Sequence, residues 1–220
     1  MPVTVSVITP AYNAAATLGR AHASVANQTF SDWEHIIVDD GSTDETSRLL
    51  TDLAHDPCVR SISQTNSGQS SALNAGLRVA AGEFVAFLDA DDEYLPAHLA
   101  DHLAFLREHP AVDLLWGGLE TVCNNPDDLM VPDVEKGSGF INIAECIVQG
   151  TIFGRRPVFQ AFQFIEDRRV WWQDYEFVQR ARQRFVVEQF PGVTYRYYRV
   201  SSASLVGQVK LKAEREGWKL

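Results

Sequence analysis

Short apolar runs alternate with amphipathic stretches through the first half of this chain, and this alternation restricts its fold more than any other feature. Runs rich in β-branched and aromatic residues predict strands at residues 3–8, 33–38, 58–63 and 83–88. Apolar residues at helical spacing predict helices between them, at residues 15–28, 44–55 and 69–81. Strands that alternate with helices form a mostly parallel sheet with right-handed crossovers. The first half therefore predicts an α/β fold in which helices flank a mostly parallel central sheet.

The second half has a less regular pattern. A helix at residues 96–107 and a strand at 112–117 are followed by the Pro-, Gly- and Asp-rich residues 124–139, which predict a mobile loop. Beyond this loop the pattern predicts a helix at 141–149, an apolar run at 157–165, a helix at 173–184, a pair of strands within 185–199 and a terminal helix over 204–218. His98 and His102 lie four residues apart on the first of these helices, which otherwise has the pattern of a surface helix.

The composition is that of a soluble globular protein. The chain has 220 residues, 45% hydrophobic and 22% charged, which suits one large domain. No run of about 18 apolar residues predicts a membrane span, and the N-terminus has no basic region followed by an apolar segment, so we expect no signal peptide. Cys58, Cys123 and Cys146 lack the spacing of zinc ligands, which predicts reduced thiols and a cytoplasmic location.

The acidic residues are unevenly distributed. The net charge is −10, and residues 1–110 hold 5 Lys and Arg against 15 Asp and Glu, whereas residues 111–220 hold 14 of each. An acidic first half argues against nucleic-acid binding, which needs a basic surface. A phosphorylated ligand bound by this half would need a positive intermediary, and a metal ion would serve.

Polar turns follow three of the predicted strands. The segments TPAYN (9–13), DDGSTD (39–44) and DADD (89–92) each come directly after an apolar run. Ligands of parallel α/β sheets bind beyond the carboxyl ends of the strands. We therefore expect the three turns to share one edge of the sheet and to form one cleft.

The DADD turn concentrates three carboxylates, Asp89, Asp91 and Asp92, within four positions. Like charges at that spacing repel one another, and a divalent cation would cancel the repulsion. A solvated turn is the alternative, because Asp is common in turns and at helix N-caps, and Asp92 alone needs no more than that. The residues themselves leave both interpretations open.

Several stretches together resemble the family 2 glycosyltransferases. They are VSVITPAYNAAATL, SVANQTFSDWEHIIVDDGSTDET and NSGQSSALNAGLRVAAGEFVAFLDADDEYLP, with WQDYEFVQR and YYRVSSASL matching more loosely. The resemblance implies the GT-A fold, with residues 1–115 as a nucleotide-sugar-binding half and residues 116–220 as the half that binds the acceptor and carries the catalytic base. It also implies metal-dependent, inverting transfer of a sugar from a nucleotide-diphosphate donor, a UDP-sugar above others, to an acceptor hydroxyl.

The resemblance assigns the nucleotide base to the first two turns. Tyr12 would lie against the base, and Pro10 and Ala11 would shape that wall. Asp40 would accept a hydrogen bond from the base, as from the N3–H of uracil. Asp39 would support the same turn.

The same resemblance makes Asp89 and Asp91 a DxD motif. Asp91 would bind Mn²⁺ or Mg²⁺, and Asp89 would reach the metal, a metal-bound water or the ribose. The cation would bridge the diphosphate. Two carboxylates alone form an incomplete coordination shell, so we expect weak metal binding in the absence of nucleotide.

Asp174 corresponds to the catalytic base of the family, although the Glu that usually precedes this base is replaced here by Gln173. Without the resemblance, Asp174 has a simpler interpretation as a helix N-cap. Ser201 stands where relatives often have His. Arg199 and Ser201 are candidate contacts to the diphosphate or the acceptor, and Trp172 is a candidate stacking surface for a sugar ring.

Gln173 and Ser201 also motivate an alternative, a nucleotide-binding relative whose transfer activity is weak or absent. A different acidic α/β enzyme fits less well, because no phosphatase motif surrounds Asp91. The charges within residues 204–218 favour a solvated terminal helix, with peripheral contact at the inner membrane face as the alternative. The sequence does not specify the donor sugar, the saccharide or lipid-linked acceptor, or the oligomeric state. It also does not specify the pathway, for which polysaccharide biosynthesis is one option.

Overall fold

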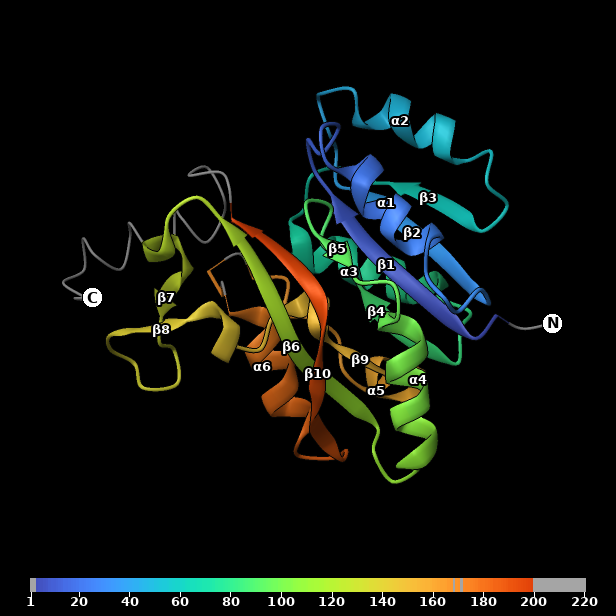
Figure 1. Cartoon of the computed structure of the whole chain (residues 1–220). Coiled ribbons are helices and arrows are strands. Elements are labelled where there is room, and N and C mark those ends of the chain that lie inside the picture. Colours follow the sequence, from blue (N-terminus) through green and yellow to red (C-terminus); the bar gives the residue numbers. More distant parts are fainter. Residues whose placement is uncertain (1–2, 168, 171, 200–220) are drawn as a thin grey trace.

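The computed structural model describes residues 3–167, 169–170 and 172–199, and these residues form a layered α/β fold (Figure 1). Its helices are α1 (Leu18–Ala26), α2 (Thr46–Leu53), α3 (Gln69–Val79), α4 (His98–Glu108), α5 (Arg156–Ala161) and α6 (Gln173–Ala181). Its strands are β1 (Val5–Ala11), β2 (Trp33–Asp39), β3 (Val59–Ser63), β4 (Phe84–Phe87), β5 (Glu93–Tyr94), β6 (Leu114–Cys123), β7 (Met130–Pro132), β8 (Phe140–Asn142), β9 (Phe153–Arg155) and β10 (Val187–Arg199). The predicted terminal helix over 204–218 lies outside the described residues.

The first four strands form the parallel part of the central sheet. The described strands follow the order β3-β2-β1-β4-β9-β6-β10-β5, and β3, β2, β1 and β4 pair in parallel. The carboxyl ends of β1, β2 and β4 therefore lie at one edge, where the backbone N–H of Asp40 donates to Ala11 and that of Leu88 donates to Ile8. This arrangement confirms the α/β fold and the mostly parallel order expected for the first half.

Strands of the second half extend the same sheet. Strand β9 pairs antiparallel with both β4 and β6, whereas β10 runs parallel to β6 and antiparallel to β5. The expected boundary between residues 115 and 116 falls inside β6. One continuous sheet thus joins the two halves.

Two elements of the second half differ from expectation. The helix predicted at 141–149 is wrong, because Phe140–Asn142 pairs with β7 and short 3-10 turns follow at Ile143–Glu145 and Gln149–Thr151. The side chain of Asn142 accepts a hydrogen bond from the backbone N–H of Ala144, which favours a tight turn over a longer helix. The pair of strands predicted within 185–199 is also wrong: β10 is a single strand, and its register shifts between Phe190 and Tyr195 without reversing the chain.

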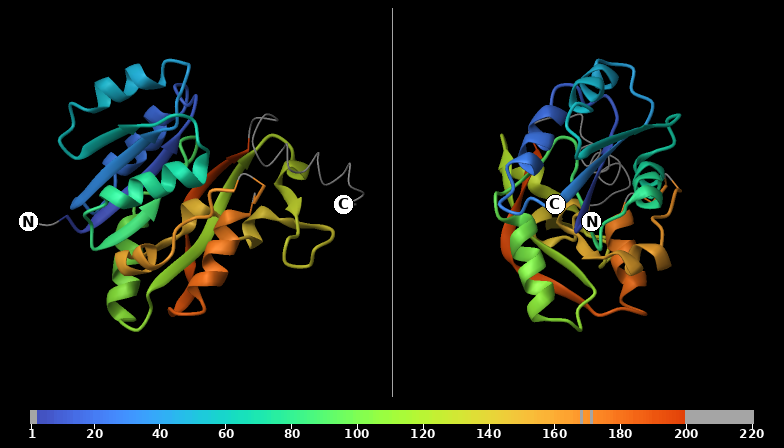
Figure 2. Two further views of the ribbon diagram at one scale, coloured as in Figure 1. Left: turned by 180° about the vertical axis from the view of Figure 1, so that it is seen from behind. Right: turned by 90° about the vertical axis from the view of Figure 1, so that its right-hand side faces the viewer.

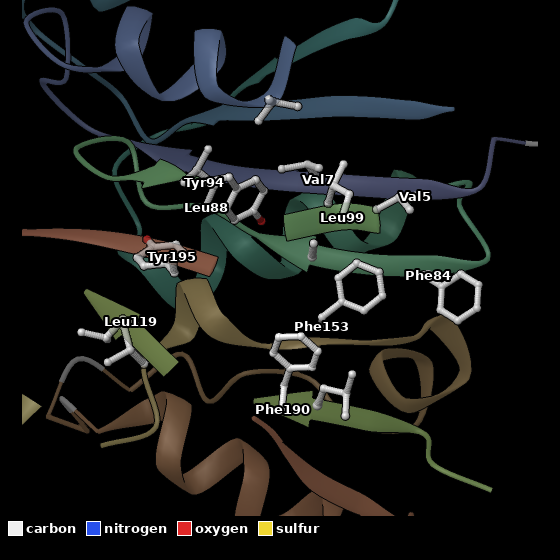
Figure 3. Close-up of a cluster of buried hydrophobic side chains, with 14 of the residues drawn as sticks. Val5, Val7, Phe84, Leu88, Tyr94, Leu99, Leu119, Phe153, Phe190 and Tyr195 are labelled. Carbon is white, nitrogen blue, oxygen red and sulfur yellow. The ribbon is translucent and has the colours of Figure 1, made fainter. Parts of the chain in front are cut away.

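Two layers of helices cover the sheet, because alternate residues of its strands point to opposite faces. On one face, Val5 and Val7 of β1 join apolar residues of α1 and α4 in a cluster that includes Phe153 and Tyr195 (Figure 3). On the other face, Ile8 packs with residues of α3, α5 and α6, which are seen from behind in Figure 2. Side chains on both faces are therefore withdrawn from water, and the functional groups are left at the edges.

Helix α4 buries one face, which includes both of its histidines. His98 and His102 have exposed fractions of 0% and 1%, and their rings stack on Tyr94 and Phe190 respectively. The opposite face of the helix carries the exposed residues Asp101, Ala104 and Arg107, as expected of a surface helix. Within the described ranges, no helix has both the length and the apolar character needed to cross a lipid bilayer.

Candidate active site

The turn after β1 presents one exposed aromatic ring at the carboxyl edge of the sheet. Tyr12 is 52% exposed, which is unusual for a residue beside a buried strand. Pro10 and Ala11 precede it as the last residues of β1, and Ala11 is buried against Ala90 of the DADD turn. The structure thus brings the turn after β1 next to the turn after β4, with the ring of Tyr12 free to meet a ligand.

The two aspartates at the end of β2, Asp39 and Asp40, are buried and hold the neighbouring loops. The carboxylate of Asp39 accepts hydrogen bonds from the backbone N–H of Ser42 and the hydroxyl of Ser47, both at 2.9 Å. That of Asp40 accepts three bonds of 2.8 Å, from the side chain of Gln64 and from the backbone of residues 67 and 68. Asp40 therefore fixes the loop that leads into α3. Its expected contact to a nucleotide base stays a prediction.

The three carboxylates of the DADD turn have different surroundings. Asp91 is exposed, Asp89 is half-buried and Asp92 is only 1% exposed. The carboxylate of Asp92 accepts hydrogen bonds from the hydroxyl of Tyr195 at 2.7 Å and from the backbone N–H of Tyr198 at 2.8 Å. Asp92 is thus neither a solvated turn residue nor an N-cap, because it ties the turn to β10.

Tyr195 contacts both ends of the DADD turn. Its hydroxyl also accepts a hydrogen bond from the backbone N–H of Asp89 at 3.3 Å. The ring fills the space beside Gly150, where a Cβ atom would lie 2.1 Å from the nearest ring atom. Neither Tyr195 nor Gly150 could be recognised from the sequence, since the segment YRYYR does not indicate which tyrosine faces the turn.

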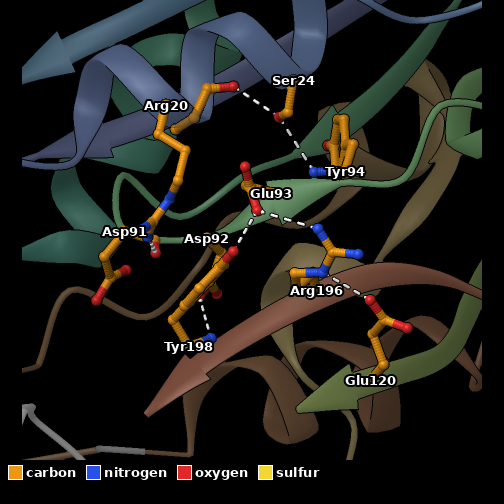
Figure 4. A network of polar contacts seen from close by, with 10 residues as sticks. Arg20, Ser24, Asp91, Asp92, Glu93, Tyr94, Glu120, Arg196 and Tyr198 are labelled. Atoms are coloured by element: carbon orange, nitrogen blue, oxygen red, sulfur yellow. Dashed lines mark hydrogen bonds and ion pairs between the residues drawn. The ribbon is translucent and has the colours of Figure 1, made fainter. Parts of the chain in front are cut away.

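A network of charged residues supports the outer side of the turn (Figure 4). The guanidinium of Arg20 donates to the backbone carbonyl of Asp91 and lies 3.8 Å above the centre of the Tyr198 ring. The hydroxyl of Tyr198 donates to Glu93, which also contacts Arg196 at 3.4 Å. Arg20 thereby brings a positive charge beside the acidic turn from α1.

Asp174 joins Asp89 in one site although 85 positions separate them in the sequence. Burial raises the pKa of Asp89 to about 7, and the negative charges of Asp91 and Asp174 act in the same direction. Burial raises the pKa of Asp174 to about 6, while hydrogen bonds from the backbone of Tyr175 and Gln149 act in the opposite direction. The structure therefore brings these two predicted residues together as carboxylates that titrate near neutral pH.

Asp174 lies in the first turn of α6 and is not its N-cap, which is Trp172. Gln149 reaches both acids of the site, since its backbone faces Asp174 and its side-chain Nε2 lies 3.4 Å from Oδ1 of Asp89. Gln149 is 3% exposed. No pattern in the sequence distinguished it, because its role depends on two partners from distant segments.

A pocket of about 200 Å³ opens beside Asp174. The hairpin of β7 and β8 covers one side of it with apolar residues, and acidic side chains lie among the lining residues. Its aromatic walls are Trp116, Trp172 and Tyr175. The pocket therefore offers aromatic and apolar surface within reach of a carboxylate.

The donor set at the DADD turn fits a hard divalent cation only in part. In the part of the chain that the structure describes, no three His, Cys, Asp or Glu side chains are grouped so as to hold a metal ion. The oxygen atoms of Asp89 and Asp91 are the donor type that Mg²⁺ and Mn²⁺ prefer. The two residues would therefore hold such a cation only together with further ligands.

The remaining predicted residues lie at the end of β10 and beyond. Arg199 is 4% exposed, and its Nη1 has no hydrogen-bond partner among the described residues. Ser201 lies outside the described residues. Arg199 is therefore a buried cation with an unused donor near the carboxyl end of its strand.

Comparisons with known proteins point to one family. The model of the family described as Glycosyl transferase family 2 matches residues 6–205. An uncharacterized glycosyltransferase of Nostoc sp. is 50% identical over 97 residues, which are 43% of this chain and 30% of the relative. The UDP-Glc:alpha-D-GlcNAc-diphosphoundecaprenol beta-1,3-glucosyltransferase WfgD of Escherichia coli is 31% identical over 121 residues, 55% of this chain and 47% of that protein.

Solved structures agree in fold. S. aureus TarS 1-349 in complex with UDP-GlcNAc has a TM-score of 0.73 and 23% identity, covering 93% of this chain and 60% of that chain. The mannosyltransferase PcManGT from Pyrobaculum calidifontis, in complex with GDP-Man and Mn²⁺, has a TM-score of 0.68 and 22% identity, covering 100% of this chain and 66% of that chain. The chain spans between about a quarter and a half of the length of the first curated relatives that it matches.

Proposed function

This chain belongs to glycosyl transferase family 2 and has the GT-A fold, and we propose that it transfers a sugar from a UDP-sugar to an acceptor hydroxyl, with inversion of the anomeric carbon. One observation carries the proposal. Asp174 from the second half lies within electrostatic reach of Asp89 from the first half, and Gln149 contacts both, at the edge where Tyr12 is exposed. A single displacement at a sugar carbon requires a base for the acceptor and groups that hold the diphosphate. The second half would supply the base, and the first half would hold the diphosphate.

The proposed reaction is one displacement. The acceptor oxygen attacks the anomeric carbon while the bond between this carbon and the diphosphate oxygen breaks, and the departing diphosphate keeps the electron pair. Asp174 takes the proton from the acceptor hydroxyl. With a pKa of about 6, the Asp174 carboxylate is mostly ionised at neutral pH and still basic enough to take part in general base catalysis.

Asp91 and Asp89 would hold a divalent cation, Mn²⁺ or Mg²⁺. Such a cation stabilises the negative charge that develops on a departing diphosphate. Arg199, with its unused donor, is the proposed second source of positive charge toward the diphosphate. Tyr12 would cover the base, with Asp40 and Asp39 supporting the loop behind it.

The comparisons support a nucleotide-sugar donor in general terms. The name of WfgD includes UDP-Glc, and TarS was solved with UDP-GlcNAc, which favours uracil as the base. The mannosyltransferase was solved with GDP-Man, so a GDP-sugar is the donor to compare. On the acceptor side, the aromatic walls of the pocket beside Asp174 suit stacking on a sugar ring, as carried by a saccharide or a lipid-linked saccharide.

Gln173 in place of the family's usual Glu favours a second candidate, a relative that binds nucleotide without efficient transfer. Calorimetric titration of UDP, GDP and dTDP with and without Mn²⁺ separates the donor question from the activity question. Metal-dependent UDP binding that is lost in Asp91→Asn supports the donor, and hydrolysis of a UDP-sugar that is lost in Asp174→Asn supports the enzyme. UDP binding without any hydrolysis or transfer favours the second candidate, and absence of nucleotide binding under every metal condition rejects both.

A further inference from the structure

A chain of side-chain amides links the start of α6 to the DADD turn. Nε2 of Gln173 donates to Oε1 of Gln69 at 2.9 Å, and Nε2 of Gln69 donates to Oδ1 of Asp89 at 3.0 Å. Gln173 is the first residue of α6 and Gln69 is the first residue of α3, so helical backbone anchors both side chains. Two hydrogen bonds thus connect three elements that are distant in the sequence.

The acceptor at the end of this chain decides the direction of both hydrogen bonds. Oδ1 of Asp89 accepts, so the NH₂ group of Gln69 is turned toward Asp89. The carbonyl oxygen of the same amide then faces residue 173, which must supply a donor. Glutamine supplies one, whereas an ionised glutamate of the same size would set an acceptor against an acceptor.

The charges around the turn lead to the same requirement. Asp89 already lies within electrostatic reach of the carboxylates of Asp91 and Asp174. A further carboxylate at position 173 would add repulsion on the side of Asp89 that Gln69 occupies. The neutral amide of Gln173 closes the chain without adding charge.

We propose that Gln173 is a positioning residue that holds Asp89 through Gln69, and that this chain requires a hydrogen-bond donor at position 173. The inference rests on the proposed function insofar as Asp89 faces the nucleotide and its cation. Because Gln69 lies between residue 173 and Asp89, this protein requires Gln173 where the family usually has Glu. Gln173→Glu, which restores the acid of the family, is therefore expected to weaken the site.

Calorimetric affinity for UDP with Mn²⁺ tests the positioning role. Gln173→Glu and Gln69→Leu are each expected to weaken binding about tenfold, in line with the loss of one hydrogen bond to a charged group. The double variant is expected to bind no more weakly than the worse single variant, since both changes break one chain. Gln183→Glu, at an exposed position after α6, adds the same charge and should leave the affinity unchanged. Unchanged or tighter binding by Gln173→Glu would overturn the positioning role.

The amide chain can be observed without any ligand. The side-chain ¹⁵N–¹H resonances of Gln69 report its hydrogen bonds, and Gln173→Glu is expected to shift them while Gln183→Glu leaves them in place. Resonances of Gln69 that do not respond to Gln173→Glu would overturn the chain, whatever the protein binds. Responsive resonances in a protein that binds no nucleotide with any metal would keep the chain and reject the proposed function instead.

Discussion

The hydroxyl of Tyr195 donates a hydrogen bond to the buried carboxylate of Asp92 at 2.7 Å, and this bond ties the DADD turn to β10. The same hydroxyl accepts from the backbone N–H of Asp89 at 3.3 Å. One oxygen atom thus contacts both the first and the last residue of the acidic turn. The exposed residue between these two contacts, Asp91, is the proposed metal ligand, so its position depends on a buried hydroxyl of β10.

Tyr195→Phe is expected to lower the free energy of unfolding by about 1.5–3 kcal/mol, because a hydrogen bond to a buried carboxylate is lost. Urea denaturation measures the loss. Tyr198→Phe is the matched comparison, since its hydroxyl donates to the half-buried Glu93, and it should cost less. Equal losses in the two variants would contradict the role given to Tyr195.

Gly150→Ala is expected to destabilise the protein by about 1–3 kcal/mol, because the added methyl group overlaps the buried ring of Tyr195. Gly19→Ala provides the contrast, since a Cβ atom at this helical position meets nothing within 4 Å. Alanine at that position should stabilise α1 by up to about 1 kcal/mol. Thermal denaturation of both variants tests whether the stability lost at position 150 comes from overlap with Tyr195 or from the replacement of any glycine.

Asp174→Asn is expected to reduce the turnover of a UDP-sugar by about 10²–10⁴-fold while leaving UDP affinity within a few-fold of wild type, because the general base is lost and the nucleotide turns are untouched. The pH profile gives a second signature. Since the pKa of Asp174 is about 6, kcat of the metal-saturated protein should fall as the pH drops through 6 and the base becomes protonated. Residual turnover in the variant should lack this limb.

His102, one of the two buried histidines of α4, predicts a specific sensitivity to acid. Burial lowers the pKa of His102 to about 4, from about 6.5 in the unfolded chain. The unfolded state therefore binds more protons as the pH falls below 6.5, and the stability contributed by neutral His102 is lost over the range between the two pKa values.

His102→Phe removes this term and keeps an aromatic ring against Phe190. The difference in unfolding free energy between the variant and wild type should shift in favour of the variant by about 2 kcal/mol from pH 8 to pH 5. Asp89 and Asp174, whose raised pKa values act in the opposite direction, are common to both proteins and cancel in this comparison. A difference that does not change with pH would show that His102 is not buried in its neutral form.

The parts of the fold that the sequence could predict are those whose pattern is local. The parallel strands β1, β2 and β4 are apolar because both of their faces are buried, and each ends in a polar turn that marks the edge of the sheet. In the second half, the pairing of β7 with β8 and the single long β10 depend on partners that no short window contains. Pro191 and Gly192 lie where the register of β10 shifts. Proline and glycine are common in turns, so the sequence alone suggests a turn at this point.

The candidate site also contains residues that the sequence could predict and residues that it could not. Tyr12, Asp89, Asp91 and Asp174 follow recognisable segments, and the structure brings them to one edge. The residues that hold them in place, such as Gln149, were missed because a supporting residue is defined by its contacts. Asp92 was noticed for its charge, yet its bond to Tyr195 spans 103 residues, and no local pattern reports a partner at that distance.

That separation also sets an order of events during synthesis. A ribosome that adds about 5–20 residues per second needs roughly 5–20 s to pass from Asp92 to Tyr195. During this interval the parallel strands of the first half can already pair, whereas the acidic turn still lacks its hydrogen bond to β10. This edge of the sheet is therefore expected to form in two stages on the ribosome, and the acidic turn reaches its final position only after β10 has emerged.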